Sequence, residues 1–130
     1  MDQKILRAHL MPILLGDSPQ ARRMSWRILW QCGIVSYLCD RKKSLTASLT
    51  PTCRFFPIPG TDAQDMTVLA LSYLASNPEF LPILIPCTEA YEAYLTQYAT
   101  LLEGRFLIRT PQQLLTLPPL SRFRYRKETP

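Results

Sequence analysis

Short apolar runs alternate with amphipathic stretches along most of the chain. The first run, residues 10–15, is wholly apolar and stops at Gly16-Asp17-Ser18-Pro19. A short run without polar alternation is typical of a strand that is buried on both faces, as in a parallel sheet. Similar runs predict further strands at 34–39, 81–86 and 105–108, and a proline-bounded piece at 53–59 that is confined to an edge of the sheet.

Helical periodicity fills the intervals between these runs. Residues 20–31 form an amphipathic helix that Asp17 or Ser18 caps and Gly33 ends; its apolar residues are Met24, Trp26, Ile28, Leu29 and Trp30. A second helix is expected over 63–76, capped by Asp62, with one apolar face made by Met66, Leu69, Ala70, Tyr73 and Leu74. A third covers 89–102 after a Thr88 cap, and a short one starts at Pro111 after Thr110.

This order of strands and helices predicts an α/β fold. Short links between alternating strands and helices imply right-handed crossovers, and hence a parallel sheet covered on both faces. We therefore expect a small Rossmann-like, three-layer α/β/α domain with a mostly parallel sheet of about four to five strands. The domain spans 10–116, with an N-terminal extension at 1–9, a polar mobile loop at 41–53 and a basic, disordered tail at 117–130.

Composition and charge narrow the possible functions. The chain has 130 residues, 47% of them hydrophobic, which excludes a disordered protein and fits one domain. The net charge of +5 comes largely from four basic residues within the last ten, so the body is nearly neutral and nucleic acid is not the expected partner. No apolar run reaches the about 20 residues of a membrane helix, and the N-terminus does not resemble a signal peptide, so we expect a cytoplasmic protein without a membrane partner.

Metal and catalytic sites find little support in the sequence. The four cysteines, Cys32, Cys39, Cys53 and Cys87, form no CxxC pair, and His9 is the only histidine. We interpret the thiols as core residues in a reducing compartment. No Ser/His/acid or Cys/His set can be assembled, and the tyrosines 91, 94 and 98 lack interleaved basic residues, so they predict core or interface rather than a base-stacking surface.

Three junctions at strand ends carry the candidate ligand-binding residues. The turn at Gly16 and Asp17 presents backbone N–H groups that could hold an anion, although a single glycine also fits a plain tight turn. Asp40 ends the second strand, either as a ribose-binding acid or as a turn residue. Thr88 and Glu89 follow the 81–86 strand and face the crevice where open α/β sheets bind ligands. A Thr cap with a carboxylate favoured by the helix dipole explains both residues without any ligand.

Read together, these segments resemble the pre-ATP-grasp domain, which begins carboxylate–amine ligases and related carbamoyl-phosphate-synthase-like ATP-grasp proteins. The resemblance covers about residues 10–116 and rests on the order and spacing of several pieces. These pieces are Met11-Pro-Ile-Leu-Leu-Gly16, Gly33-Ile-Val-Ser-Tyr-Leu-Cys-Asp40, Arg54-Phe-Phe-Pro-Ile-Pro59 and Ile83-Leu-Ile-Pro86-Cys-Thr-Glu89-Ala-Tyr91.

The resemblance implies a substrate-side role. In the family, two further lobes bind ATP and magnesium, activate a carboxylate as an acyl phosphate and transfer it to an amine, while the pre-ATP-grasp domain shapes the cleft. Its substrate-facing positions map onto Gly16, Asp17, Asp40, Thr88 and Glu89. After Pro111-Gln-Gln-Leu-Leu the sequence departs from the family and continues as Thr116-Leu-Pro-Pro, without those lobes.

Two functions follow as expectations. The first is a stand-alone or truncated pre-ATP-grasp-like accessory module or remnant, non-catalytic alone, that associates with an ATP-grasp chain or with itself and meets ATP and Mg²⁺ only through such a partner. The alternative is an independent small-ligand or nucleotide-binding Rossmann-like module, because a shared fold does not fix function. A nucleic-acid binder that uses the basic tail is the least favoured interpretation.

Overall fold

A single parallel sheet forms the centre of the protein. The computed structural model describes residues 10–42, 44 and 50–116. The sheet has five strands in the order β3-β2-β1-β4-β5, and every neighbouring pair is parallel. The strands are β1 (Leu10–Leu15), β2 (Ser36–Asp40), β3 (Cys53–Pro57), β4 (Leu81–Pro86) and β5 (Leu107–Ile108). The expected α/β class, parallel pairing and edge position of the proline-bounded strand are confirmed.

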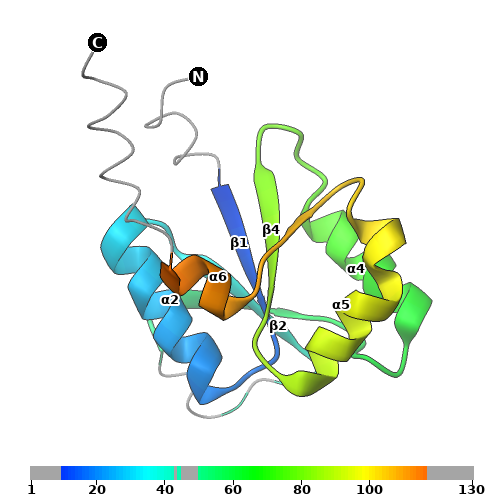
Figure 1. Cartoon of the computed structure of the whole chain (residues 1–130), viewed down its shortest axis with the longest axis horizontal. Helices are drawn as coiled ribbons and strands as arrows, with labels where there is room; N and C mark the ends of the chain where they lie inside the picture. The colour runs from blue at the N-terminus through cyan, green and yellow to red at the C-terminus, as the bar shows by residue number, and fades with distance from the viewer. Residues whose placement is uncertain (1–9, 43, 45–49, 117–130) are drawn as a thin grey trace.

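Helices cover both faces of this sheet (Figure 1). They are α2 (Pro19–Cys32), α4 (Gln64–Leu74), α5 (Glu89–Leu102) and α6 (Pro111–Thr116). The chain moves outward from β1 to β2 and β3, then crosses back to β4 and β5 on the other side of β1. Right-handed crossovers in opposite directions place their helices on opposite faces, so α2 lies on one face, beside α6, and α4 and α5 lie on the other. The architecture is the Rossmann-like three-layer arrangement.

The apolar core has one half on each side of the sheet. On the α4 and α5 side, Ile13, Leu15 and Leu84 pack with helix residues such as Leu71, Tyr91 and Tyr94. On the α2 side, Leu14, Leu38 and Ile85 pack with Ala21 and Met24. Successive residues of β1 therefore point into different core halves, which explains why its sequence is apolar without alternation.

The caps of α2 and α5 form as the sequence predicts. Ser18 rather than Asp17 is the N-cap of α2, and its hydroxyl accepts from the Ala21 N–H. Gly33 ends the same helix with a φ of +71°. The Thr88 hydroxyl caps α5 by accepting from the Tyr91 N–H at 3.3 Å.

The tyrosines of α5 belong to the core, as expected. Tyr91 and Tyr94 are buried, and the Tyr94 ring stacks on Tyr98 at a centroid distance of 4.8 Å. None of the four cysteines forms a disulfide, and the thiols of Cys39 and Cys87 are buried.

The expected start of the second helix is wrong. Helix α4 begins at Gln64 with Ala63 as its N-cap residue, and no side chain caps it. Asp62 is exposed and its carboxylate lies 3.8 Å from the Arg41 guanidinium. The helix also ends at Leu74, well before Pro78.

The expected apolar face of α4 is also wrong in part. Met66, Leu69 and Tyr73 point to solvent, whereas Thr67 and Leu71 are fully buried. Apolar residues occupy more than one side of this helix, so their spacing does not identify the inward side. On α2, likewise, Trp26 and Trp30 are exposed while Ala21, Met24 and Ser25 face the sheet.

Several expectations have smaller corrections or fall outside the described residues. Strand β2 starts at Ser36 and includes Asp40, and β5 is limited to Leu107–Ile108. The N-terminal extension with His9, residues 43 and 45–49 of the 41–53 loop, and the basic tail lie outside the residues that the structure describes. Within the described part, no helix is long and apolar enough to cross a bilayer.

Candidate functional site

The candidate residues gather at the carboxyl ends of β1, β2 and β4. The strand order reverses direction between β1 and β4, and open α/β sheets bind ligands beside such a point. Backbone hydrogen bonds tie the chain together immediately beyond the strands: Cys87 N–H donates to the Leu15 carbonyl at 2.8 Å, and Gly16 N–H donates to the Cys39 carbonyl at 2.9 Å. The turn after β1 therefore lies between the ends of β2 and β4.

Gly16 is packed directly against Thr88. Its φ is +102°, and a β-carbon at this position would lie 2.5 Å from Thr88 Cγ2 and 2.8 Å from Thr88 Oγ1. Only glycine fits both the backbone conformation and the space. Thr88 thus fills the gap between the ends of β1 and β4 while its hydroxyl caps α5.

The Asp40 carboxylate accepts hydrogen bonds from backbone N–H groups, one of them in the turn after β1. The Asp17 N–H donates to Asp40 Oδ2 at 2.8 Å, and the Arg41 N–H donates to Asp40 Oδ1 at 2.7 Å. In a phosphate-binding strand–turn–helix unit, the N–H groups of this turn would face the ligand. Here a carboxylate of the chain itself takes one of these positions.

The Asp17 carboxylate is held in turn by its own partners. Its Oδ1 lies 2.9 Å from Arg22 Nη1, and the Asp17 and Arg22 side chains are only 7% and 21% exposed, respectively. Its Oδ2 accepts from the Ser44 N–H at 3.1 Å. Asp17 therefore fastens the start of α2 and the chain after β2, and its charge is balanced by Arg22.

Ser18 links the start of α2, which follows β1, to the chain that follows β4. Its hydroxyl donates to the Cys87 carbonyl at 2.9 Å and accepts from the Ala21 N–H at 3.1 Å. The next residue, Pro19, has no N–H, and Arg22 N–H donates to the Ser18 carbonyl at 3.1 Å. The Ala21 and Arg22 N–H groups at the start of α2 are thus bonded within the protein.

The buried thiols and the buried phenol near this turn stay protonated at neutral pH. Burial and then the charge of Asp40 raise the pKa values of the Cys39 thiol and the Tyr91 phenol. Burial, with a smaller effect from Glu92, raises the pKa of the Cys87 thiol to about 12. A thiol must be a thiolate to act as a nucleophile, so neither cysteine is activated. Within the described part of the chain, no three His, Cys, Asp or Glu side chains are grouped to hold a metal ion.

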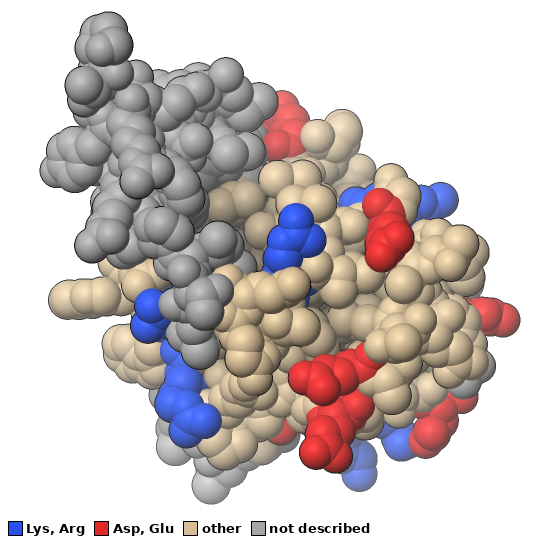
Figure 2. Space-filling model, viewed as in Figure 1, with Lys and Arg blue, Asp and Glu red and all other residues tan. Residues whose placement is uncertain are grey.

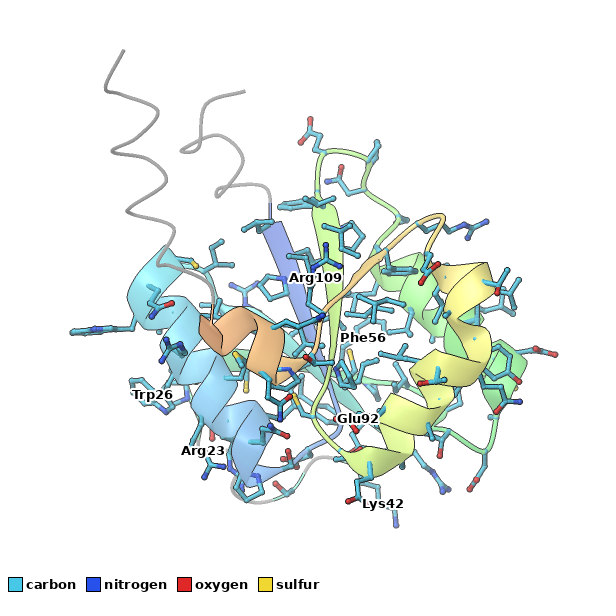
Figure 3. The ribbon with its side chains drawn as sticks, in the orientation of Figure 1. Arg23, Trp26, Lys42, Phe56, Glu92 and Arg109 are labelled. Carbon is cyan, nitrogen blue, oxygen red and sulfur yellow. The ribbon has the colours of Figure 1, made fainter. Side chains whose placement is uncertain are left out.

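Glu89 stands apart from the other four predicted residues. It is exposed in the first turn of α5 together with Glu92. Figure 2 shows acidic side chains over the start of α5, and Figure 3 places Glu92 and Lys42 at this same end of the molecule. Among the described residues, the Glu89 carboxylate makes no hydrogen bond or ion pair with the other four. This edge presents carboxylates to solvent.

The sequence indicates the three residues that complete the arrangement only in part. The sequence indicates Ser18 only as an alternative cap, and it indicates no role for Arg22 or Arg41. Asp17 and Arg22 are five positions apart across the start of α2, which is outside the i, i+3 and i, i+4 spacings that indicate an ion pair on one helix. Nothing local indicates that Asp40 accepts from Asp17, because the two are 23 positions apart in the chain.

The chain was compared with models of known protein families, with curated proteins and with solved structures, and none of the three comparisons finds a match.

Proposed function

We propose that this chain is an accessory domain of the pre-ATP-grasp type, non-catalytic alone, that forms the substrate side of a cleft completed by a separate ATP-grasp chain. The observation that carries the proposal is the closed turn after β1. The Asp17 N–H is bonded to the Asp40 carboxylate and the Ala21 N–H to the Ser18 hydroxyl, which favours a supporting role for this Rossmann-like unit over nucleotide binding.

Electrostatics at this turn oppose a phosphate. A nucleotide phosphate would have to displace the Asp40 carboxylate from the Asp17 N–H and then lie beside the carboxylates of both residues. Two like unit charges 4 Å apart repel by about 1 kcal/mol in water and about 4 kcal/mol at the effective dielectric of a protein surface. In this proposal ATP and Mg²⁺ are held by the partner chain's lobes.

The exposed edge suits a substrate-side role. The Glu89 carboxylate is solvent-facing next to Thr88, at the end of the sheet where α/β domains meet ligands. A carboxylate in this position is suited to the amine of an acceptor substrate, by charge-assisted hydrogen bonding. The thiols of Cys39 and Cys87 are buried in the core and form no disulfide, which supports a place in a reducing compartment, the cytoplasm.

The alternative, an independent small-ligand or nucleotide-binding module, has weaker support. Thr88 fills the space beside Gly16, and Asp40 and Asp17 are engaged with backbone and Arg22. Such a module would need these residues to exchange their internal partners for a ligand.

Thermal unfolding with and without Mg-ATP tests the proposal. A ligand at 100 times its dissociation constant adds about 2.7 kcal/mol, which raises the melting temperature of a domain of this size by about 10 °C. We expect no rise with Mg-ATP for the chain alone, and ATP turnover with carboxylate and amine substrates only when a chain bearing ATP-grasp lobes is added. Saturable stabilisation by Mg-ATP, or ATP turnover by this chain alone, would overturn the proposal.

A further inference from the structure

The outer side of α2 carries a face of alternating cationic and aromatic residues. Arg23, Trp26, Arg27 and Trp30 follow the i, i+3, i+4, i+7 spacing of one helix face. Trp26 is 54% exposed and Trp30 85% exposed, which is unusual for the largest apolar side chain. Figure 3 shows Arg23 and Trp26 on the side of α2 away from the sheet. We call these four residues the α2 face.

A groove continues this face toward α6. A cavity of about 300 Å³ lies between the two helices, lined by Gln20, Arg23, Met24, Arg27 and Pro111. Its lining combines apolar side chains with two guanidinium groups. Helix α2 contains no Asp or Glu, and within the described residues neither Arg23 nor Arg27 has an acidic partner. The surface is therefore complementary to apolar groups accompanied by carboxylates.

A surface of this complementary kind lies on the same chain. Helix α4 exposes Met66, Leu69 and Tyr73 at 62%, 69% and 75%, in the i, i+3, i+7 spacing of one helix face. Asp65 is exposed beside Met66 in the first turn, and α4 contains no Lys or Arg. We call Asp65, Met66, Leu69 and Tyr73 the α4 face.

We propose that copies of this chain associate head to tail, with the α2 face of one copy packed on the α4 face of the next. The basic, aromatic face supplies guanidinium groups and indole rings, and the acidic, apolar face supplies a carboxylate and apolar side chains. Contiguous exposed apolar residues with a polar rim mark interaction sites, and opposite charges at that rim fix the pairing. This inference does not depend on the proposed function.

Charge disfavours the symmetric pairings. A two-fold contact between two α2 faces would set arginines against arginines, and one between two α4 faces would set Asp65 against Asp65. The two faces lie on opposite sides of the sheet, α2 on one and α4 on the other (Figure 1). A contact between different faces extends in one direction, so it produces a ring or an open chain of copies rather than a closed dimer.

A single-stranded nucleic acid is the other partner that Trp and Arg side chains can stack with. The second copy is favoured because the described residues outside α2 are not basic overall, whereas the complementary α4 face is present at the same concentration as the α2 face.

Sedimentation of two single variants and their mixture tests the inference. Arg27→Glu damages only the α2 face and Leu69→Arg only the α4 face. Arg27 and Leu69 are both exposed, so we expect both variants to fold, and circular dichroism checks this. We expect wild type to form species larger than dimers and each variant alone to associate at least about tenfold more weakly. An equimolar mixture should form dimers and nothing larger, because each pair retains one intact α2 face and one intact α4 face.

The matched control is Arg54→Glu, the same charge reversal at an exposed position of the edge strand β3, which should associate like wild type. A wild-type protein that stays monomeric up to its solubility limit would overturn the inference, including the case in which it binds single-stranded RNA through the α2 face. So would a mixture that stays monomeric, or association that only one of the two variants weakens.

Discussion

At the scale of single residues, Gly16 is the position where the turn after β1 tolerates least change. Its φ of +102° penalises any side chain, and a β-carbon there would approach Thr88 Cγ2 to 2.5 Å. We expect Gly16→Ala to lower the free energy of unfolding by about 3 kcal/mol or more, since strained backbone alone costs on the order of 1–3 kcal/mol. Urea denaturation measures this change.

Gly33 provides the matched control for Gly16. Its φ is also positive, at +71°, but no atom lies within 4 Å of a β-carbon placed there. Gly33→Ala should therefore cost only about 1 kcal/mol, the backbone part alone. Equal losses at the two glycines would show that contact with Thr88 contributes nothing, contrary to the close packing of Gly16 on Thr88.

A buried hydroxyl pair gives a second prediction at this scale. Ser25 of α2 and Thr52 before β3 are both fully buried, with their hydroxyl oxygens 2.6 Å apart. Ser25→Ala leaves the Thr52 hydroxyl buried without this partner, and we expect a loss of about 1–3 kcal/mol in chemical denaturation. The double variant Ser25→Ala with Thr52→Val should lose less than the two single losses combined; strict additivity would contradict the pairing.

The sequence predicts helix caps better than hydrogen bonds between residues that are far apart in the chain. Ser18, Thr88 and Gly33 act where local spacing places them, because capping is a contact between near neighbours. Asp62 fails as a cap, since the helix starts one residue later than its position requires. The bond between Asp17 and Asp40 depends on which strands are neighbours, and no local pattern contains that information.

At the scale of elements, helix α4 shows which features of a helix can be predicted from the spacing of apolar residues and which cannot. Its existence follows from the apolar periodicity, but its orientation is decided by which side fits the sheet. Leu71 is fully buried in the core, whereas Leu69 is 69% exposed. The orientation of α4 therefore assigns very different roles to two leucines of one helix.

Alanine substitutions at these leucines test the orientation of α4. Leu71→Ala should cost about 2–5 kcal/mol, as is usual for a buried leucine, because it removes core packing. Leu69→Ala should stay within about 0.5 kcal/mol of wild type, because surface changes rarely do more. Thermal or urea unfolding at low protein concentration measures both. The reverse order would mean that α4 packs on the sheet through its other side.

At the scale of the whole molecule, the alternation of strands and helices is enough to predict a parallel three-layer fold. The sequence pattern does not specify the strand order, yet it is this order that brings the ends of β1, β2 and β4 together. Four predicted site residues meet there, Gly16 with Thr88 and Asp17 with Asp40. Spacing alone could not show that they contact one another.

The buried thiol of Cys87 and the buried phenol of Tyr94 determine how the stability of the fold should respond to alkaline pH. Burial raises the pKa of the Cys87 thiol to about 12 and, with smaller effects from Tyr98 and Asp65, that of the Tyr94 phenol to about 12. In the unfolded chain the reference pKa is about 8.5 for a thiol and about 10 for a phenol. Between these values and pH 12, unfolding releases protons, so stability falls as pH rises.

Urea denaturation at a series of pH values measures this fall. We expect full stability below about pH 8.5 and a loss of up to about 1.4 kcal/mol per pH unit for each such group above its unfolded pKa. Cys87→Ala should make the decline shallower between about pH 8.5 and 9.5, where most phenols are still protonated in both states. A stability that is constant or increasing from pH 9 upward would contradict the burial of these groups.

The most direct test of the central claim is an amide NMR titration of the labelled chain with Mg-ATP. The turn after β1 is closed by Asp40, Ser18 and Thr88, and we expect it to bind no phosphate. The Gly16, Asp17 and Ala21 amide resonances should therefore stay in place as Mg-ATP is added. Saturable shifts centred on these three amides would show that the turn opens to hold phosphate, and the chain would then be a nucleotide-binding module.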